Sequence, residues 1–192
     1  SSIIKVGAIP IFADVDIDTQ NISLNSIKKV LSKKTKAILC VHLAGLPCDM
    51  EKICKFAKEK KIFIIEDCAQ SHGASINKKN VGTFGNVAAW SFCNDKIMTT
   101  GGEGGMLTCN DEKLWERAWR YKDHGKSPSV RLGKQKSGQK FRWVHEQFGL
   151  NFRMSEMQSA IGRVSLRRLP SWLQKRRDNA NVLNDILSQV SL

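Results

Sequence analysis

The stretch SFCNDKIMTTGGEGG (residues 91–105) places one lysine, Lys96, between two apolar runs. The run VAAWSF (residues 87–92) predicts a strand before the lysine, and the run MLTC predicts another after the glycines. The four glycines allow backbone angles that other residues avoid, and they let a ligand approach closely. A lysine on such a loop can be shielded from water and act as a nucleophile, although most lysines are solvated surface charges.

A second apolar run, IFII (residues 62–65), ends directly in two acids, Glu66 and Asp67. In open α/β sheets, ligands bind beyond the carboxyl ends of the strands, which is where this pattern puts Asp67. The commoner role of an acid after a strand is to cap a helix or to close a loop. Both roles stay open on this segment alone.

Asp67 and Lys96 together match the requirements of a site for pyridoxal 5'-phosphate (PLP). This cofactor needs a lysine for its Schiff base and a carboxylate that faces the ring nitrogen. The carboxylate keeps the nitrogen protonated, so that the ring can accept electrons from the substrate. The pair therefore predicts a PLP site.

The segments EDCAQSHGA (residues 66–74), VGTFGNVAAWSF (81–92) and DKIMTTGGEGG (95–105) resemble the DegT/DnrJ/EryC1/StrS family of PLP-dependent nucleotide-sugar aminotransferases. The same resemblance extends, in the order of the family, over nearly the whole chain. The further matching segments are IPIFADVDIDTQNIS (9–23), TKAILCVHLAGLPCDM (35–50), HGK (124–126) and FGLNFRMSEMQSAIG (148–162). One departure is visible, because the loop reads TTGGEGG where many members of the family read TTGEGG.

The resemblance implies a role for each of five residues. Asp67 would pair with the pyridine nitrogen, and Gln70 would contact the hydroxyl side of the ring. Ser91 would hold the phosphate, and Lys96 would bond covalently to the cofactor. Asn151 would reach the phosphate bound by a neighbouring subunit. No metal ligand is expected.

The resemblance also implies a fold and an activity. The fold would be α/β, the large domain of a fold type I PLP-dependent transferase, with a mostly parallel sheet and helices on both faces. Residues 1–192 would form part of this PLP-binding domain, and 171–192 would be the helix that leads toward a small C-terminal domain. We expect a fragment, because the N-terminal segment and the C-terminal domain of the family are not in the sequence.

The implied reaction moves an amino group from an amino acid, usually glutamate, to a keto-deoxy sugar carried on a nucleotide, in polysaccharide or O-antigen (lipopolysaccharide) biosynthesis. Dehydratases of the family have a histidine in place of the lysine, so Lys96 favours transamination. The expected protein is a cytoplasmic homodimer that binds neither nucleic acid nor membranes.

The periodicity of apolar residues predicts alternating strands and helices, which is typical of a sheet covered by helices. Strands are expected at residues 10–13, 37–43, 62–65, 87–92 and from 106 onward. Helices are expected at 23–33, at 50–61 with Asp49 as N-cap, and at 111–122. A capping box of Ser155 and Gln158 begins a further helix, with Met157, Ala160, Ile161 and Val164 facing inward. Pro170 is expected to end that helix, and a last helix is expected at 172–190.

The net charge of +13 supports a different class of function. Such a charge attracts anions, and two stretches are densely basic, at residues 131–142 and 163–177. The alternative interpretation is therefore a non-catalytic module that binds RNA or an acidic partner. That interpretation requires exposed aromatic residues among the basic ones, whereas five aromatics lie within apolar runs.

The six cysteines and four histidines show no spacing typical of zinc ligands. The cysteines fall mostly in apolar runs, as small buried hydrophobic residues do. Reduced thiols in a cytoplasmic protein are the simplest interpretation.

Overall fold

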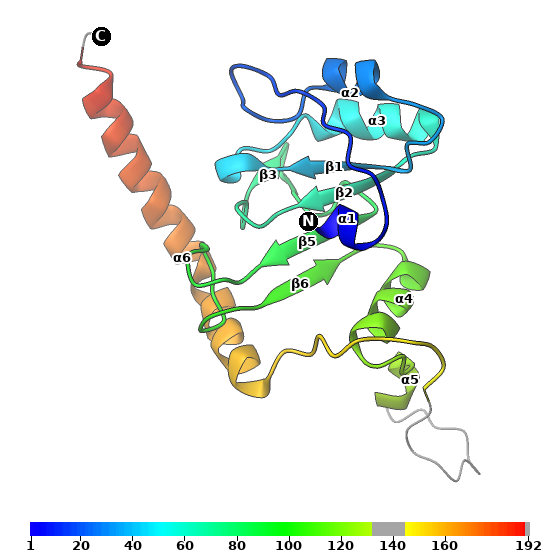
Figure 1. Cartoon of the computed structure of the whole chain (residues 1–192). Helices are drawn as coiled ribbons and strands as arrows, with labels where there is room; N and C mark the ends of the chain where they lie inside the picture. The colour runs from blue at the N-terminus through cyan, green and yellow to red at the C-terminus, as the bar shows by residue number, and fades with distance from the viewer. Residues whose placement is uncertain (132–144, 191–192) are drawn as a thin grey trace. The chain divides into compact units, whose positions relative to one another are not determined.

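The computed structural model describes residues 1–131 and 145–190, without the side chains of residues 130 and 131. The chain divides into two compact units (Figure 1). The first consists of Ser1–Trp90 and Leu107–Asn110, and the second of Ser91–Met106 and Asp111–Leu192.

The strands form a four-stranded sheet in the order β1-β2-β5-β6, and most of its residues belong to the first unit. Its strands are β1 (Ala37–Val41), β2 (Phe63–Asp67), β5 (Val87–Ser91) and β6 (Gly105–Thr108). The three strands β1, β2 and β5 are parallel, and Figure 1 shows β6 running in the opposite direction to β5. This confirms the predicted mostly parallel sheet, and all four strands expected from residue 37 onward belong to it.

Two helices pack against the sheet in this unit, α2 (Leu24–Val30) and α3 (Met50–Lys60). The predicted cap of α3 is confirmed, because the Asp49 side chain accepts a hydrogen bond from the Lys52 N–H at 3.3 Å. Apolar side chains of both helices form one core with alternate residues of β1 and β2, since successive strand residues point to opposite faces. The core residues are Ile27, Ile38, Cys40, Cys48, Met50, Ile53, Phe56, Ala57 and Ile64.

Several short elements complete the unit. They are α1 (Ser2–Lys5), the 3-10 helix η1 (Leu43–Gly45), and the antiparallel strands β3 (Ser75–Ile76) and β4 (Lys79–Asn80). Asn77 and Lys78 join β3 to β4 with positive φ angles, as tight hairpin turns require.

The N-terminal third of the chain differs from the prediction in two places. Residues 10–13 form no strand, and an isolated bridge joins Val15 to Ile22 instead. Ile11 and Phe12 are 67% and 88% exposed, and only Ala13 of this apolar run packs against the core, which is too little to favour a strand. The helix expected at 23–33 ends at Val30, because Leu31 adopts an extended conformation.

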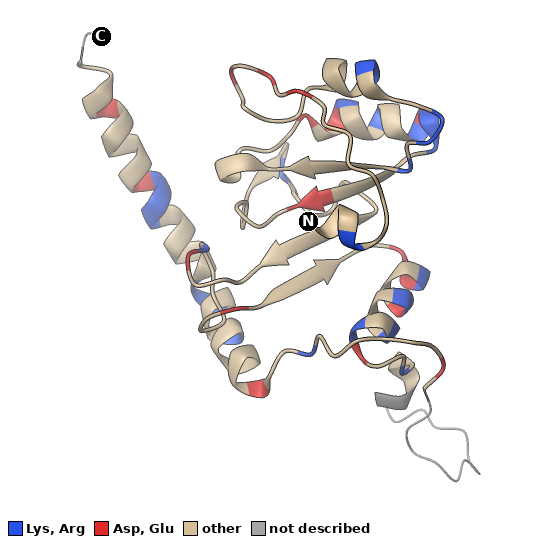
Figure 2. Ribbon diagram, viewed as in Figure 1, with Lys and Arg blue, Asp and Glu red and all other residues tan. Residues whose placement is uncertain are grey.

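The second unit contains the loop after β5 and the helices α4 (Glu112–Lys122), α5 (Pro128–Arg131) and α6 (Glu156–Leu187). The predicted capping box of α6 is confirmed: the Ser155 side chain accepts from the Gln158 N–H, and the Gln158 side chain accepts from the Ser155 N–H. The basic stretch at 163–177 lies on this helix, where Figure 2 shows its charged residues. The stretch at 131–142 falls almost wholly outside the described residues.

Two predictions about α6 are wrong. Pro170 does not end it, since one helix of 32 residues continues to Leu187. Proline removes one backbone hydrogen bond, but the good helix formers on both sides of it sustain the helix. The expected inward face is also wrong: Met157, Ile161 and Val164 are exposed, whereas Gly162 and Ser165 are buried.

None of the described helices combines the length and the hydropathy that crossing a membrane requires.

Candidate functional site

Asp67 is the last residue of β2 and lies at the carboxyl end of the parallel strands. Its side chain is half-buried, and its Oδ1 atom accepts the Ala69 N–H at 3.0 Å. Its backbone carbonyl accepts the His42 N–H at 3.1 Å, which continues the contact between β1 and β2 by one residue. The structure thus places the carboxylate at the edge of the sheet where open α/β proteins bind ligands.

Gln70 follows Asp67 in an exposed turn. Its Oε1 atom accepts the Ala44 N–H at 2.7 Å. Because a backbone N–H can only donate, this contact requires the amide oxygen on that side and sets the direction of the amide group. The Nε2 atom, with its two N–H donors, therefore faces away from Ala44.

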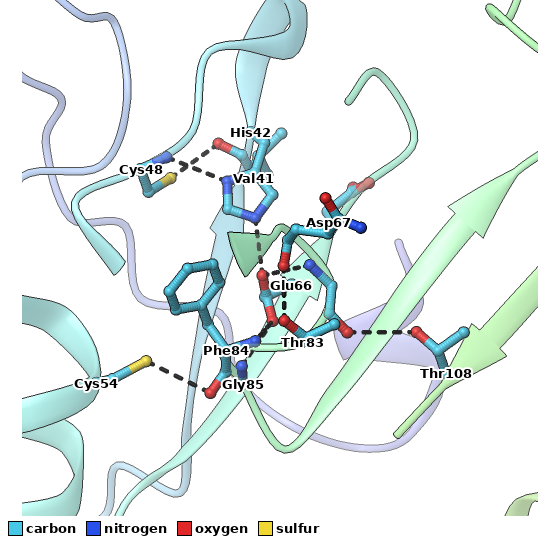
Figure 3. A network of polar contacts seen from close by, with 12 residues as sticks. Val41, His42, Cys48, Cys54, Glu66, Asp67, Thr83, Phe84, Gly85 and Thr108 are labelled. Atoms are coloured by element: carbon cyan, nitrogen blue, oxygen red, sulfur yellow. Dashed lines mark hydrogen bonds and ion pairs between the residues drawn. The ribbon is translucent and has the colours of Figure 1, made fainter. Parts of the chain in front are cut away.

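Glu66 is a fully buried carboxylate that accepts four hydrogen bonds (Figure 3). Oε2 accepts from His42 Nε2 at 3.1 Å and from the Gly82 N–H at 2.7 Å. Oε1 accepts from the Phe84 and Gly85 N–H groups at 2.9 and 2.6 Å. Burial alone would raise the pKa of Glu66, but the hydrogen bonds from His42, Gly85 and Gly82 outweigh it and hold this pKa below its usual range.

The tautomer of His42 follows from its second contact. Its Nδ1 atom accepts the Cys48 N–H at 3.1 Å, so the ring proton lies on Nε2 and is donated to Glu66. Both side chains are completely buried. The ring therefore joins β2 to the segment that follows β1.

His42, Glu66 and Cys68 bring their ligand-type atoms within 4.8 Å of one another, a cluster that the spacing of the sequence did not reveal. Such a group could hold a metal ion in other surroundings. Here both lone pairs of each Glu66 oxygen already accept a hydrogen bond, and His42 uses both ring nitrogens. These contacts favour a structural hydrogen-bond network over a metal site.

In the second unit, Lys96 lies in a tight turn after β5. Its N–H donates to the Cys93 carbonyl at 3.1 Å, and its side chain is 20% exposed. The Nζ atom donates to Asp95 Oδ2 at 3.1 Å, and this hydrogen bond lowers the pKa of Asp95. Ser91 ends β5, where its hydroxyl accepts the Cys93 N–H at 3.3 Å.

The glycine turn after Lys96 closes back on β5. Phe92 N–H donates to the Gly104 carbonyl at 2.8 Å, and Thr100 N–H donates to the Phe92 carbonyl at 3.2 Å. Gly101 and Gly102 have φ angles of 83° and 141°, which side chains rarely allow. The loop has one glycine more than the TTGEGG of many family members, and this glycine is needed because two successive positions adopt such angles.

The first turns of α6 support the lysine loop. Ser165 Oγ donates to the Thr99 carbonyl at 3.1 Å, and Gln158 Nε2 donates to the Glu103 carbonyl at 2.7 Å. A Cβ atom at Gly162 would lie 2.9 Å from the Thr100 methyl group. Gly162 and Ser165 are thus buried because the loop packs on them.

Asn151 is exposed and lies in the segment before α6. Its Oδ1 atom accepts from Arg153 Nε at 3.0 Å, and Arg153 pairs with Asp123 at 3.5 Å. A backbone bridge joins Asn151 to Asp123. These contacts hold Asn151 near the C-terminal end of α4.

The structure brings the predicted residues together in two groups. Asp67 and Gln70 lie three residues apart in the first unit, whereas Ser91, Lys96 and Asn151 belong to the second. The roles of all five residues stay predictions. Asn21, His42 and Glu66 are not among the predicted site residues. They are buried polar residues among apolar ones, and that pattern in the sequence could have indicated them.

The first unit has a cavity of about 590 Å³ that is separate from the predicted site residues. Asn21, Cys48, Asp49 and Lys52 are among the residues that line it, and none of the five predicted site residues does.

Solved aminotransferases and a sugar dehydratase have the same fold as this chain. An aminotransferase from Psychrobacter cryohalolentis is 52% identical, with a TM-score of 0.93 over 98% of this chain and 47% of that one. The GDP-4-keto-6-deoxy-D-mannose-3-dehydratase of E. coli, solved with bound hydrated PLP, is 32% identical with a TM-score of 0.86, over 97% of this chain and 49% of that one.

The model of the DegT/DnrJ/EryC1/StrS aminotransferase family matches residues 1–192, and the chain belongs to this family. Among curated proteins, a GDP-perosamine synthase of Escherichia coli O157:H7 is 39% identical over 176 residues, which are 92% of this chain and 45% of that protein. The chain thus spans about half the length of the relatives that it matches.

Proposed function

We propose that the chain is the PLP-binding part of an aminotransferase that moves an amino group from an amino acid, with glutamate as the expected donor, to a keto sugar linked to a nucleotide. The observation that carries this proposal is Lys96, on a supported loop at the end of β5, in a chain that matches the family throughout. Relatives named as sugar aminotransferases or synthases of amino sugars support the substrate class.

The residues of the two groups fit PLP chemically. Asp67 offers a half-buried carboxylate at the carboxyl end of a parallel strand, and Gln70 offers amide donors whose direction is set by Ala44. Ser91 offers a hydroxyl, and Lys96 offers a primary amine that is mostly shielded from water. PLP needs these four kinds of partner: a carboxylate for its ring nitrogen, donors for its ring hydroxyl, a hydroxyl for its phosphate and an amine for its aldehyde.

When bound, PLP supplies an acceptor for the electrons that the substrate carbon releases. The residues of the chain do the rest. Asp67 would hold a proton on the ring nitrogen, and Ser91 would bind the phosphate. Lys96 would attach the cofactor. Once the amino group of the substrate has displaced the lysine from the cofactor, the free Lys96 amine would take and return the proton of the substrate carbon as general base.

The wider assignments belong to the same proposal. The protein acts as a homodimer in which Asn151 binds the phosphate held by the partner subunit. The exposed apolar residues of α6 support an interface with another subunit. The proposal also includes a role in lipopolysaccharide biosynthesis and a cytoplasmic location. Membership of the family supports the first, and the six cysteines, which are free in the described part of the chain, support the second.

The comparisons do not support the alternative, a basic module that binds RNA or an acidic partner. They match the chain to enzymes along its entire length. The basic residues at 163–177 are exposed on α6, which a folded enzyme also tolerates.

Borohydride reduction of the PLP-loaded protein, followed by peptide mapping, tests the assignment of Lys96. Reduction makes the bond between lysine and cofactor permanent, so the label should appear on Lys96. Lys96→Ala should lower the rate of amino transfer by more than the factor of roughly 10²–10⁴ that the loss of a general base alone costs, because the nucleophile is lost as well. Lys96→Arg should be equally inactive, since a guanidinium stays protonated.

Lys113→Ala, on the exposed face of α4, is the matched control and should keep full activity. Both Lys96 variants should fold, which circular dichroism checks. Label on a different lysine, or wild-type turnover by Lys96→Ala, would overturn the proposal.

A further inference from the structure

Asn21 is a polar residue only 3% exposed, and its side chain spans a turn that is distant in the sequence. Its Nδ2 atom donates to the Leu46 carbonyl at 2.9 Å. Its Oδ1 atom accepts the Leu43 N–H at 3.1 Å. One buried amide therefore binds both ends of residues 43–46, more than twenty positions away.

The turn held by Asn21 has an unfavourable backbone conformation. Ala44 has a φ angle of 52°, in the left-handed region that side chains seldom adopt, and Gly45 follows with 85°. A residue stays in this region only where its surroundings determine the conformation. The two hydrogen bonds of Asn21, with the Leu46 N–H to Leu43 carbonyl contact at 2.9 Å, supply that determination.

The strained residue is the one that contacts Gln70. The Ala44 N–H donates to Gln70 Oε1, and its direction depends on the φ angle of Ala44. A Cβ atom at Gly45 would lie 3.3 Å from the Gln70 carbonyl, so this turn and the Gln70 backbone are closely packed. The contacts run from Asn21 through the turn to the amide of Gln70, all within the first unit.

We propose that Asn21 is a positioning residue for the cofactor site: it fixes the turn at 43–46, so that the Ala44 N–H holds the oxygen of the Gln70 amide and leaves the Nε2 donors for the ring hydroxyl of PLP. This inference rests on the proposed function. It adds a residue that touches neither substrate nor cofactor and acts through two others.

Asn21→Ala removes both contacts with the turn, and Gln70→Met removes the amide without adding charge. Each should weaken the binding of PLP to the cofactor-free protein by about three- to tenfold, the loss expected for one hydrogen bond. In the double variant, Asn21→Ala should cause no further weakening. Asn25→Ala, on the exposed side of α2, is the matched control and should bind as the wild type does.

Two further readouts separate positioning from a general loss of structure. The pH midpoint of the visible band of bound PLP should shift in the same direction in Asn21→Ala and in Gln70→Met, because both change the donor at the ring oxygen. Hydrogen exchange of the Ala44 N–H in the cofactor-free protein should speed up in Asn21→Ala but not in Asn25→Ala. If Asn21→Ala does not fold, Asn21→Ser, which brings a hydroxyl but no charge into the buried site, should give a change of the same kind.

An equal loss of PLP binding from Asn21→Ala in the wild-type and Gln70→Met backgrounds would overturn the inference, because Asn21 would then act by another route. Unchanged exchange at Ala44 would also overturn it. A wild-type protein that does not bind PLP would instead contradict the proposed function, and with it the role given to Gln70.

Discussion

At the scale of single residues, Glu66 organises the carboxyl end of β2. Its four hydrogen bonds come from His42 and from the segment that precedes β5. Because side chains alternate along a strand, this carboxylate points to the opposite face from its neighbour Asp67. The buried Glu66 carboxylate and its hydrogen bonds therefore hold in place the strand end that carries Asp67.

Glu66→Gln should lower the free energy of unfolding by about 3 kcal/mol. The NH₂ group of the glutamine replaces one carboxylate oxygen, and the N–H donors that faced this oxygen are left without an acceptor. Urea denaturation measures this loss. The control Glu59→Gln, exposed on α3, should be nearly neutral. A Glu66→Gln protein as stable as the control would show that the network contributes little.

The same carboxylate predicts a dependence on pH. The folded-state pKa of Glu66 lies below its ordinary value of 4.5, so the charged form stabilises the fold above that pH. This contribution is lost as the pH falls from about 4.5 through the lower, folded-state pKa. The wild-type protein should thus lose its stability advantage over Glu66→Gln in that range.

At the scale of elements, the sequence predicts well whatever depends on local patterns. The apolar runs at β1, β2 and β5, the Asp49 cap and the capping box of α6 all follow from neighbouring residues. The predictions that failed concern features that depend on contacts with distant parts of the chain. Residues 10–13 have a strand pattern, but only Ala13 among them packs against the core. The inward face of α6 is set by the lysine loop that packs on Gly162 and Ser165.

Pro170→Ala tests how α6 tolerates its proline. The substitution restores a backbone N–H inside the helix and removes the clash of the ring, and the exposed site loses no packing. It should stabilise the helix by up to about 3 kcal/mol and raise the midpoint of thermal unfolding, followed by circular dichroism. Asn179→Ala, farther along the same helix, should give a smaller gain. No gain at position 170 would mean that the helix is locally distorted to accommodate the ring.

At the scale of the whole molecule, the proposed dimer gives Asn151 a role that the mixing of two variants can test. If this residue serves the site of its partner, an Asn151→Ala subunit and a Lys96→Ala subunit form one intact site between them. Random mixing of the two inactive variants should then recover about a quarter of the wild-type activity, since half of the dimers are hybrids and each hybrid has one intact site.

Each variant mixed only with itself provides the control and should remain inactive. Size-exclusion chromatography of differently tagged subunits shows whether hybrids form. Hybrid dimers without recovered activity would assign Asn151 to the site of its own subunit.

Helix α6 also has a mechanical consequence. With 32 residues it is roughly 48 Å long, and its buried residues, Gly162 and Ser165, lie near the end that touches the lysine loop. A force on its far end reaches that loop only through the segment around Pro170, where the backbone has one hydrogen bond fewer. We therefore expect the helix to bend most easily at the proline, so that a sideways displacement of its far end would move the lysine loop less than a displacement along its axis would.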